Sequence, residues 1–243
     1  MAIPFESILD LLDGSIDKCI DYPVNVKINE ILSHHNCSYM VRHEDTMLIF
    51  ACRNGDHEMV RELFNLNANP NCEGPLSTPL FEAVNNNHNV VVDMLLEKSV
   101  DINKKHIWSG GYNALHFACK NNNYKIVKKL CDTNINVNEL TNSGTTPLHI
   151  ASAYADTKII EYLVDKGAFT DIQNNYGETP LFFASRYGPP ENIQKLLSYG
   201  CDPNIKNKDG LSPATCTDTE IVKNFNSSGI VKKFMSYIFT SSC

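Results

Sequence analysis

Short apolar segments recur in pairs along the middle of this chain. The first segment of a pair is apolar at most positions, as in residues 148–151, and the second has apolar residues three and four apart, as in Ile159, Ile160 and Leu163. Spacing of three and four places side chains on one face of a helix. The pattern therefore predicts pairs of short helices.

A six-residue stretch opens each of these pairs. In its clearest form it reads Thr146-Pro147-Leu148-His149-Ile150-Ala151, and its first position recurs at intervals of 32 to 35 residues. The six first positions are Thr46, Thr78, Asn113, Thr146, Thr179 and Ser212. A period of this length indicates a repeat array, in which each unit buries its apolar face against its neighbours. We therefore expect one array over residues 42–217.

The turn inside a pair is marked by Gly or Asn. Gly55 stands there in the first clear repeat, and the runs 85–87 and 121–123, all Asn, stand there in the second and third. Asn tolerates the left-handed backbone conformation, so it can replace Gly in a tight turn.

The two ends of the chain lack the six-residue stretch. Residues 1–41 begin with an amphipathic stripe from Phe5 to Leu12, and we interpret residues 15–41 as a degenerate first repeat that caps the array. Residues 218–243 include an amphipathic segment at 229–239, and we expect cap helices there.

The six-residue stretch and its spacing resemble the ankyrin repeat. The resemblance implies an all-α fold, a solenoid of stacked helix-turn-helix units with protruding β-hairpin loops. It also implies that Thr146 and Pro147 open a helix, and that His149 bridges backbone and hydroxyl groups of neighbouring loops. His116 at the same position of the third repeat is then structural as well.

Charge and cysteine content restrict the environment and the partners. The net charge of −7 argues against binding to nucleic acid or to an anionic membrane. No basic region followed by an apolar run opens the chain, and no window is long and apolar enough to cross a membrane. We expect an intracellular, cytoplasmic protein whose nine cysteines are free thiols, with nuclear entry left open.

Catalytic chemistry has little support in the sequence. His116 and Cys119 stand three residues apart on one predicted helix, a spacing that suits two metal ligands, but no second pair with zinc-like spacing follows. The chain also lacks a glycine-rich phosphate loop, a His-Glu-x-x-His segment and a nucleophile elbow. We therefore expect no enzyme activity, no cofactor, no metal and no small-molecule substrate.

The resemblance implies binding of another protein through the loop tips and the concave face of the first helices. Carried onto this chain, it gives partner-binding positions that are rich in aromatic and charged side chains, which are enriched at the energetic centres of interfaces. The predicted partner-binding residues are Trp108, Tyr112, Lys120, Thr145, Tyr154, Tyr176, Glu178, Arg186 and Tyr187. The alternative is that some of these rings only cover the adjacent repeat.

Two functions fit this sequence. The first is an adaptor or inhibitor without chemistry of its own, such as a viral or bacterial protein that acts on a host. Asn- and Lys-rich runs agree with such a source, and a host's own protein is equally permitted. One version is a mimic of the inhibitor of NF-κB, although residues 13–17 lack the paired serines of its degradation signal. The second is a substrate-recognition subunit that docks onto ubiquitin-ligase machinery through the segment from Ile230 to Phe239.

Overall fold

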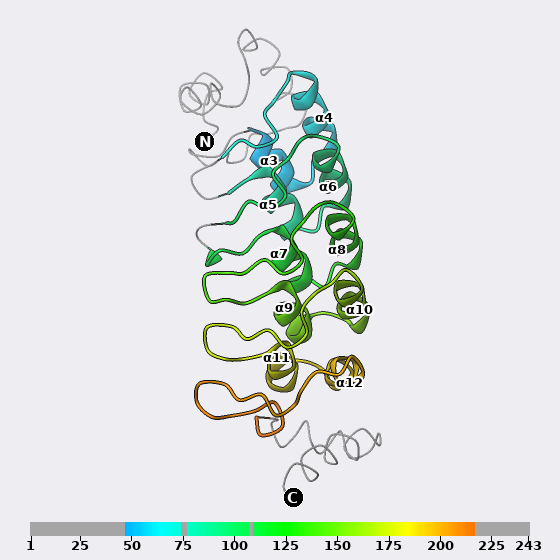
Figure 1. The fold of residues 1–243 in the computed structure, drawn as a ribbon. Coiled ribbons are helices and arrows are strands. Elements are labelled where there is room, and N and C mark those ends of the chain that lie inside the picture. Colours follow the sequence, from blue (N-terminus) through cyan, green and yellow to red (C-terminus); the bar gives the residue numbers. More distant parts are fainter. Residues whose placement is uncertain (1–46, 74–76, 107–108, 217–243) are drawn as a thin grey trace, which may run out of the picture. The chain divides into compact units, whose positions relative to one another are not determined.

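The computed structural model describes residues 47–73, 77–106 and 109–216, and these contain ten α-helices packed as helix-turn-helix pairs (Figure 1). The all-α prediction is therefore confirmed. The chain divides into two compact units, residues 1–108 and 109–243. Within the described residues, no helix is long and apolar enough to span a bilayer.

The first unit contains two described pairs of helices. They are α3 (Met47–Asn54) with α4 (His57–Asn65), and α5 (Pro79–Asn85) with α6 (Asn89–Leu96). The first helices α3 and α5 pack together, and so do the second helices α4 and α6. Leu48, Met59 and Leu95 are fully buried in this core.

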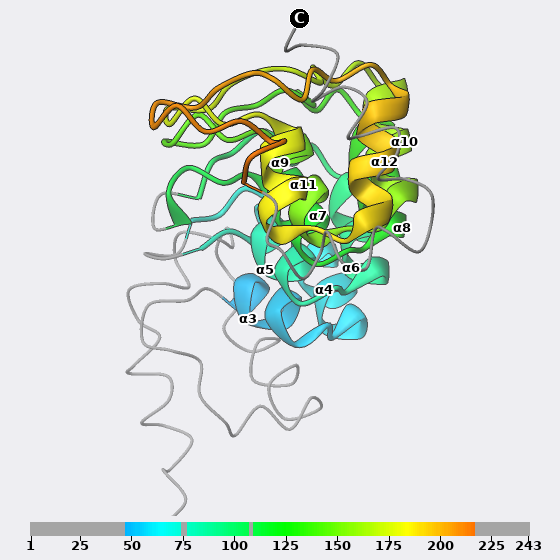
Figure 2. The same cartoon turned by 90° about the horizontal axis from the view of Figure 1, so that it is seen from below.

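The second unit repeats this arrangement three times. Its pairs are α7 (Ala114–Lys120) with α8 (Tyr124–Cys131), α9 (Pro147–Tyr154) with α10 (Thr157–Asp165), and α11 (Pro180–Tyr187) with α12 (Pro190–Ser198). The first helices α7, α9 and α11 form one row, and the second helices α8, α10 and α12 form another (Figure 2). The first helices contribute Leu115, Leu148 and Leu181 to the core, where all three are fully buried.

The six-residue stretch forms the start of each first helix, as predicted. Thr146 caps α9 and Thr179 caps α11, where its hydroxyl accepts the Phe182 N–H at 3.2 Å. Proline follows at the first helical position, where a backbone N–H would have no partner within the helix. The Asn turns are confirmed too, since Asn87 and Asn122 adopt φ of 62° and 54°.

The loops before the first helices are narrow hairpins that pair with one another. Within one hairpin the Asn174 N–H donates to Glu178 O at 2.9 Å. Between hairpins of the second unit, Asn175 N–H donates to Ser143 O and Lys208 N–H to Tyr176 O, each at 2.9 Å. These hairpins extend on the side of the first helices, away from α10 and α12 (Figure 1). The predicted hairpin loops are thus present.

The terminal segments lie outside the described residues. The helix from Phe5 to Leu12, the degenerate repeat at 15–41 and the cap at 218–243 therefore stay predictions. The same holds for the ubiquitin-ligase alternative, because it depends on residues 230–239.

Candidate functional site

His149 is part of the framework of the second unit. Its Nδ1 accepts the Thr146 N–H at 3.1 Å and lies 2.7 Å from the Thr146 hydroxyl, while Nε2 lies 3.0 Å from Glu178 O. This network is consistent with a neutral ring that carries its proton on Nε2. Burial lowers the pKa of His149 from 6.5 to about 4. The interpretation of His149 as a bridge between neighbouring loops is confirmed.

His116 and Cys119 also belong to the buried framework of the second unit. The His116 Nε2 lies 3.1 Å from Thr145 O, and its Nδ1 faces the backbone and side chain of Asn113. Cys119 is fully buried, and burial raises the pKa of its thiol well above the ordinary value, so the thiol stays protonated. Among the described residues, no group of three or more His, Cys, Asp or Glu side chains is placed to hold a metal ion.

The framework leaves a small set of side chains exposed at the ends of the first helices. In α9 every residue from Pro147 to Ala153 is buried, and only the last residue, Tyr154, is exposed, to 54%. The last residue of α11, Tyr187, is exposed to 52%. Both tyrosines stand eight residues after the first position of their repeat, so the repeat period brings them to the ends of adjacent helices.

Tyr187 rests on a row of rings. It contacts Phe183 edge to face at 5.9 Å, and Phe183 contacts His149 in the same way at 5.1 Å. The Arg186 guanidinium lies 5.3 Å from the centre of the Tyr187 ring, a cation–π distance. The phenol is therefore supported from below by the framework and remains open on its outer side.

Glu178 lies beside Arg186 and is mostly enclosed. Its carboxylate accepts the Asn174 side-chain amide at 3.0 Å and lies 3.7 Å from the Arg186 guanidinium. The exposed fractions differ greatly, at 14% for the Glu178 side chain and 51% for that of Arg186. Glu178 thus stabilises the hairpin before α11 through Asn174, whereas Arg186 faces solvent.

Tyr112, just before α7, and Lys120, the last residue of α7, both lie near the Phe117 ring. The Tyr112 ring lies 5.2 Å from His116 and 5.3 Å from Phe117, and the Lys120 ammonium lies 5.9 Å from the Phe117 ring. Burial raises the pKa of Tyr112, and the electrostatic effect of Tyr154 adds to this rise. We name the set Tyr112, Lys120, Tyr154, Arg186 and Tyr187 the tyrosine patch.

Three other predicted residues lie elsewhere. Tyr176 stands at a hairpin tip with 61% of its surface exposed, and its N–H donates to Asn174 Oδ1 at 2.9 Å. Thr145 is only 4% exposed and its hydroxyl pairs with that of Ser143, so Thr145 supports the hairpin and does not belong to the exposed surface. Trp108 lies outside the described residues.

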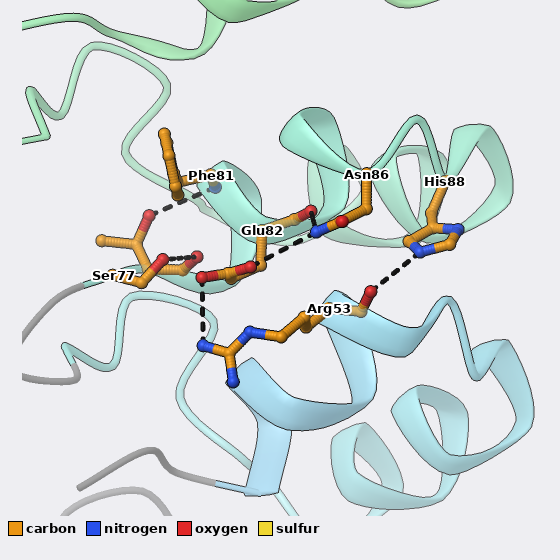
Figure 3. A network of polar contacts seen from close by, with 7 residues as sticks. Arg53, Ser77, Phe81, Glu82, Asn86 and His88 are labelled. Atoms are coloured by element: carbon orange, nitrogen blue, oxygen red, sulfur yellow. Dashed lines mark hydrogen bonds and ion pairs between the residues drawn. The ribbon is translucent and has the colours of Figure 1, made fainter. Parts of the chain in front are cut away.

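Sequence reasoning missed a polar network in the first unit. The Arg53 guanidinium contacts Glu82 Oε1 at 3.1 Å, and the Asn86 amide contacts Glu82 Oε2 at 3.3 Å (Figure 3). Glu82 stands where the second unit has Phe117, Ile150 and Phe183. A charged residue at a position that is apolar in the other repeats was the signal in the sequence that could have revealed this network.

Comparison with known families agrees with the repeat period. A family model described as ankyrin repeats (3 copies) matches residues 25–106, 48–141 and 115–207. These overlapping matches extend over well more than half of the chain. No curated protein matches the chain.

Proposed function

Because the chain belongs to the ankyrin-repeat family, whose arrays serve as scaffolds for protein–protein interaction, we propose that it binds another protein through the tyrosine patch. Tyr176 at the neighbouring hairpin tip adds a second point of contact. Arrays of this family are generally binding domains without catalysis, and the proposed activity is binding alone.

The observation that carries this proposal is the exposure of large aromatic rings at positions that packing does not need. Tyr154 and Tyr187 each expose more than half of their surface, although every other residue of α9 is buried. Tyrosine combines a large apolar ring with a hydroxyl that needs a hydrogen-bond partner when it is buried, and it is enriched at interface hot spots. A partner that covers both rings would gain contact area without reorganising the helices beneath them.

The framework supports a rigid binding surface. Phe183 contacts the Tyr187 ring and is itself in contact with His149, whose ring is fixed at both nitrogens. A side chain that is already held in place loses little freedom on binding, so more of the contact energy appears as affinity.

Affinity capture with two matched variants tests the proposal. The first variant, Tyr154→Ala with Tyr187→Ala, removes the exposed rings of the first helices. The second, Tyr124→Ala with Tyr199→Ala, removes two partly exposed tyrosines at the start of α8 and directly after α12, at 39% and 36% exposure. We expect the first variant to lose captured proteins that the wild type and the second variant retain, with all three melting cooperatively. Equal capture by the two variants would contradict the proposal.

A finer version is a host-directed inhibitor that mimics the inhibitor of NF-κB. Its support is the array of ankyrin repeats itself and the composition of the chain. The direct test is titration of the purified chain with a purified transcription factor of the NF-κB family. Absence of binding there, with other partners still captured, would remove this version and leave the scaffold function in place.

A further inference from the structure

We propose that the tyrosine patch binds an acidic linear segment of its partner, in which two carboxylate side chains stand about six residues apart with an apolar residue between them. This inference rests on the proposed function and adds the chemistry of the partner. Lys120 and Arg186 receive the two carboxylates, and Tyr154 receives the apolar residue.

The first argument is the sign of the exposed charges. Both charged residues of the patch, Lys120 and Arg186, are cationic and exposed, in a chain whose net charge is −7. A cationic surface on an acidic protein favours an acidic partner and disfavours a basic one, because complementary potentials govern encounter and selection.

The second argument is the state of Arg186. Among the residues that the structure describes, its one acidic contact is Glu178 at 3.7 Å, which is longer than a good charge-assisted hydrogen bond. Glu178 is bound more closely by the Asn174 amide, at 3.0 Å, and is largely enclosed. A guanidinium presents five N–H donors in a planar fork, so the exposed Arg186 can take a second carboxylate from solvent.

Other acidic side chains stand at the border of the patch. Asp156 and Glu191 lie in the starts of α10 and α12, which belong to the row of second helices, and Lys158 follows Asp156 within one turn. Lys158 offsets one of these two negative charges, and α7, α9 and α11 themselves contain no Asp or Glu. The row of first helices, where Lys120, Tyr154 and Arg186 lie, therefore keeps its cationic character.

The third argument is spacing. Lys120 ends α7 and Arg186 lies near the end of α11, with α9 packed between these helices. Packed helices are separated by about 8–10 Å, so the two cations lie roughly 20 Å apart. An extended chain advances about 3.3 Å per residue, which places two matching carboxylates about six residues apart. Tyr154 at the end of α9 lies between them. Alternate side chains of an extended chain share a face, so the apolar residue that meets Tyr154 stands two or four positions after the first carboxylate.

A peptide series tests the spacing and the charge together. The probes are fluorescein-labelled peptides of Gly and Ser with two Glu residues placed three to nine positions apart and a Leu two positions after the first Glu, and a parallel set with Lys in place of Glu. Binding is measured by fluorescence anisotropy at low and at physiological salt. We expect the Glu peptides to bind most tightly near a spacing of six, and the Lys peptides to bind weakly at every spacing.

Three variants give effects of different sign. Arg186→Glu should weaken binding of the best Glu peptide about tenfold. Glu178→Gln keeps an acceptor for Asn174 but removes the competing charge, so it should strengthen binding about threefold. Arg61→Glu, at an exposed position of the second helix α4, makes the same charge change elsewhere and should leave the affinity unchanged.

The outcomes separate this inference from the proposed function. Equal binding of Glu and Lys peptides, no dependence on spacing, or an equal loss in Arg61→Glu would overturn the acidic-segment inference. If captured proteins still depend on Tyr154 and Tyr187 in that case, the scaffold function stands and another partner chemistry is responsible. If that dependence is also missing, the proposed function itself fails.

Discussion

Replacing Asn113 by Thr should stabilise the second unit, because the fourth repeat shows what the third lacks. The Thr146 hydroxyl lies 3.4 Å from the His149 N–H and 2.7 Å from His149 Nδ1. A hydroxyl can accept the first proton and donate its own to the second atom. One oxygen atom therefore satisfies both groups.

Asn113 cannot do the same for His116. Its Oδ1 accepts the His116 N–H at 3.2 Å but lies 2.7 Å from His116 Nδ1, which also accepts the Asn113 N–H at 3.2 Å. The His116 ring carries its proton on Nε2, where it is donated to Thr145 O, so Nδ1 is an acceptor. Asn113 Oδ1 and His116 Nδ1 are then two acceptors that face each other. Turning the amide by 180° would instead point its NH₂ at the His116 N–H. The Asn113 Nδ2 is moreover buried without a hydrogen-bond partner.

The expected gain follows from these contacts. An unsatisfied buried polar group costs about 1–3 kcal/mol, and Asn exceeds Thr as a helix cap by only a few tenths. Asn113→Thr should therefore raise the free energy of unfolding by about 1–2 kcal/mol, or Tm by roughly 2–8 °C. Urea unfolding monitored by circular dichroism measures it, and the reverse change, Thr146→Asn, should cost a similar amount. If Asn113→Thr is neutral while Thr146→Asn is also tolerated, the hydrogen-bond reasoning is wrong.

Two further changes follow from single groups in the second unit. The folded-state pKa of His149 is lowered from 6.5 to about 4, so its neutral form stabilises the fold above pH 6.5. This contribution, about 3 kcal/mol, is lost as the pH falls toward 4. Urea unfolding at several pH values should show that His149→Gln loses less stability over this range than the wild type. Burial raises the pKa of Asp171. Asp171 accepts the Asp202 N–H, just as Asn138 accepts the Phe169 N–H one repeat earlier. Asn138 also donates from Nδ2 to Gly167 O, a bond that Asp171 cannot form because it has no amide. Asp171→Asn should therefore raise Tm at neutral pH, and the gain should shrink in acid as the wild-type carboxyl becomes protonated; thermal melts at both pH values check it.

The repeat period was sufficient to predict most of the described fold. It located the starts of the first helices at Thr146 and Thr179 because a cap followed by Pro and Leu depends on local chemistry alone. The Asn turns could be predicted for the same reason, since a positive φ at Asn87 or Asn122 is a property of the residue and its neighbours.

The candidate site could be predicted only in part. Position within the repeat identified Tyr154, Arg186 and Tyr187, which the structure leaves exposed. Thr145 has the equivalent position to Tyr112, but its short hydroxyl side chain folds into the hairpin and pairs with Ser143. Such a difference depends on the length of one side chain and on a partner two residues away, which the repeat period does not encode.

The Arg53–Glu82 pair in the first unit provides the last prediction, a double-mutant cycle with Arg53→Met and Glu82→Gln. Their side chains are only 23% and 10% exposed, so removal of either partner leaves the other charge poorly solvated. Glu82→Gln keeps an oxygen for the Asn86 amide, so the cycle isolates the charge pair.

We expect each single change to destabilise the unit, and the double change to cost less than the sum by about 1–3 kcal/mol. Lys104 and Glu73, whose side chains are 43% and 60% exposed, form the matched control pair, for which solvent screening should leave no measurable coupling. Equal coupling in both cycles would mean that burial does not set the strength of these pairs. In that event, the presence of a charged Glu82 where the other repeats have an apolar residue would need an explanation other than the stability of the unit.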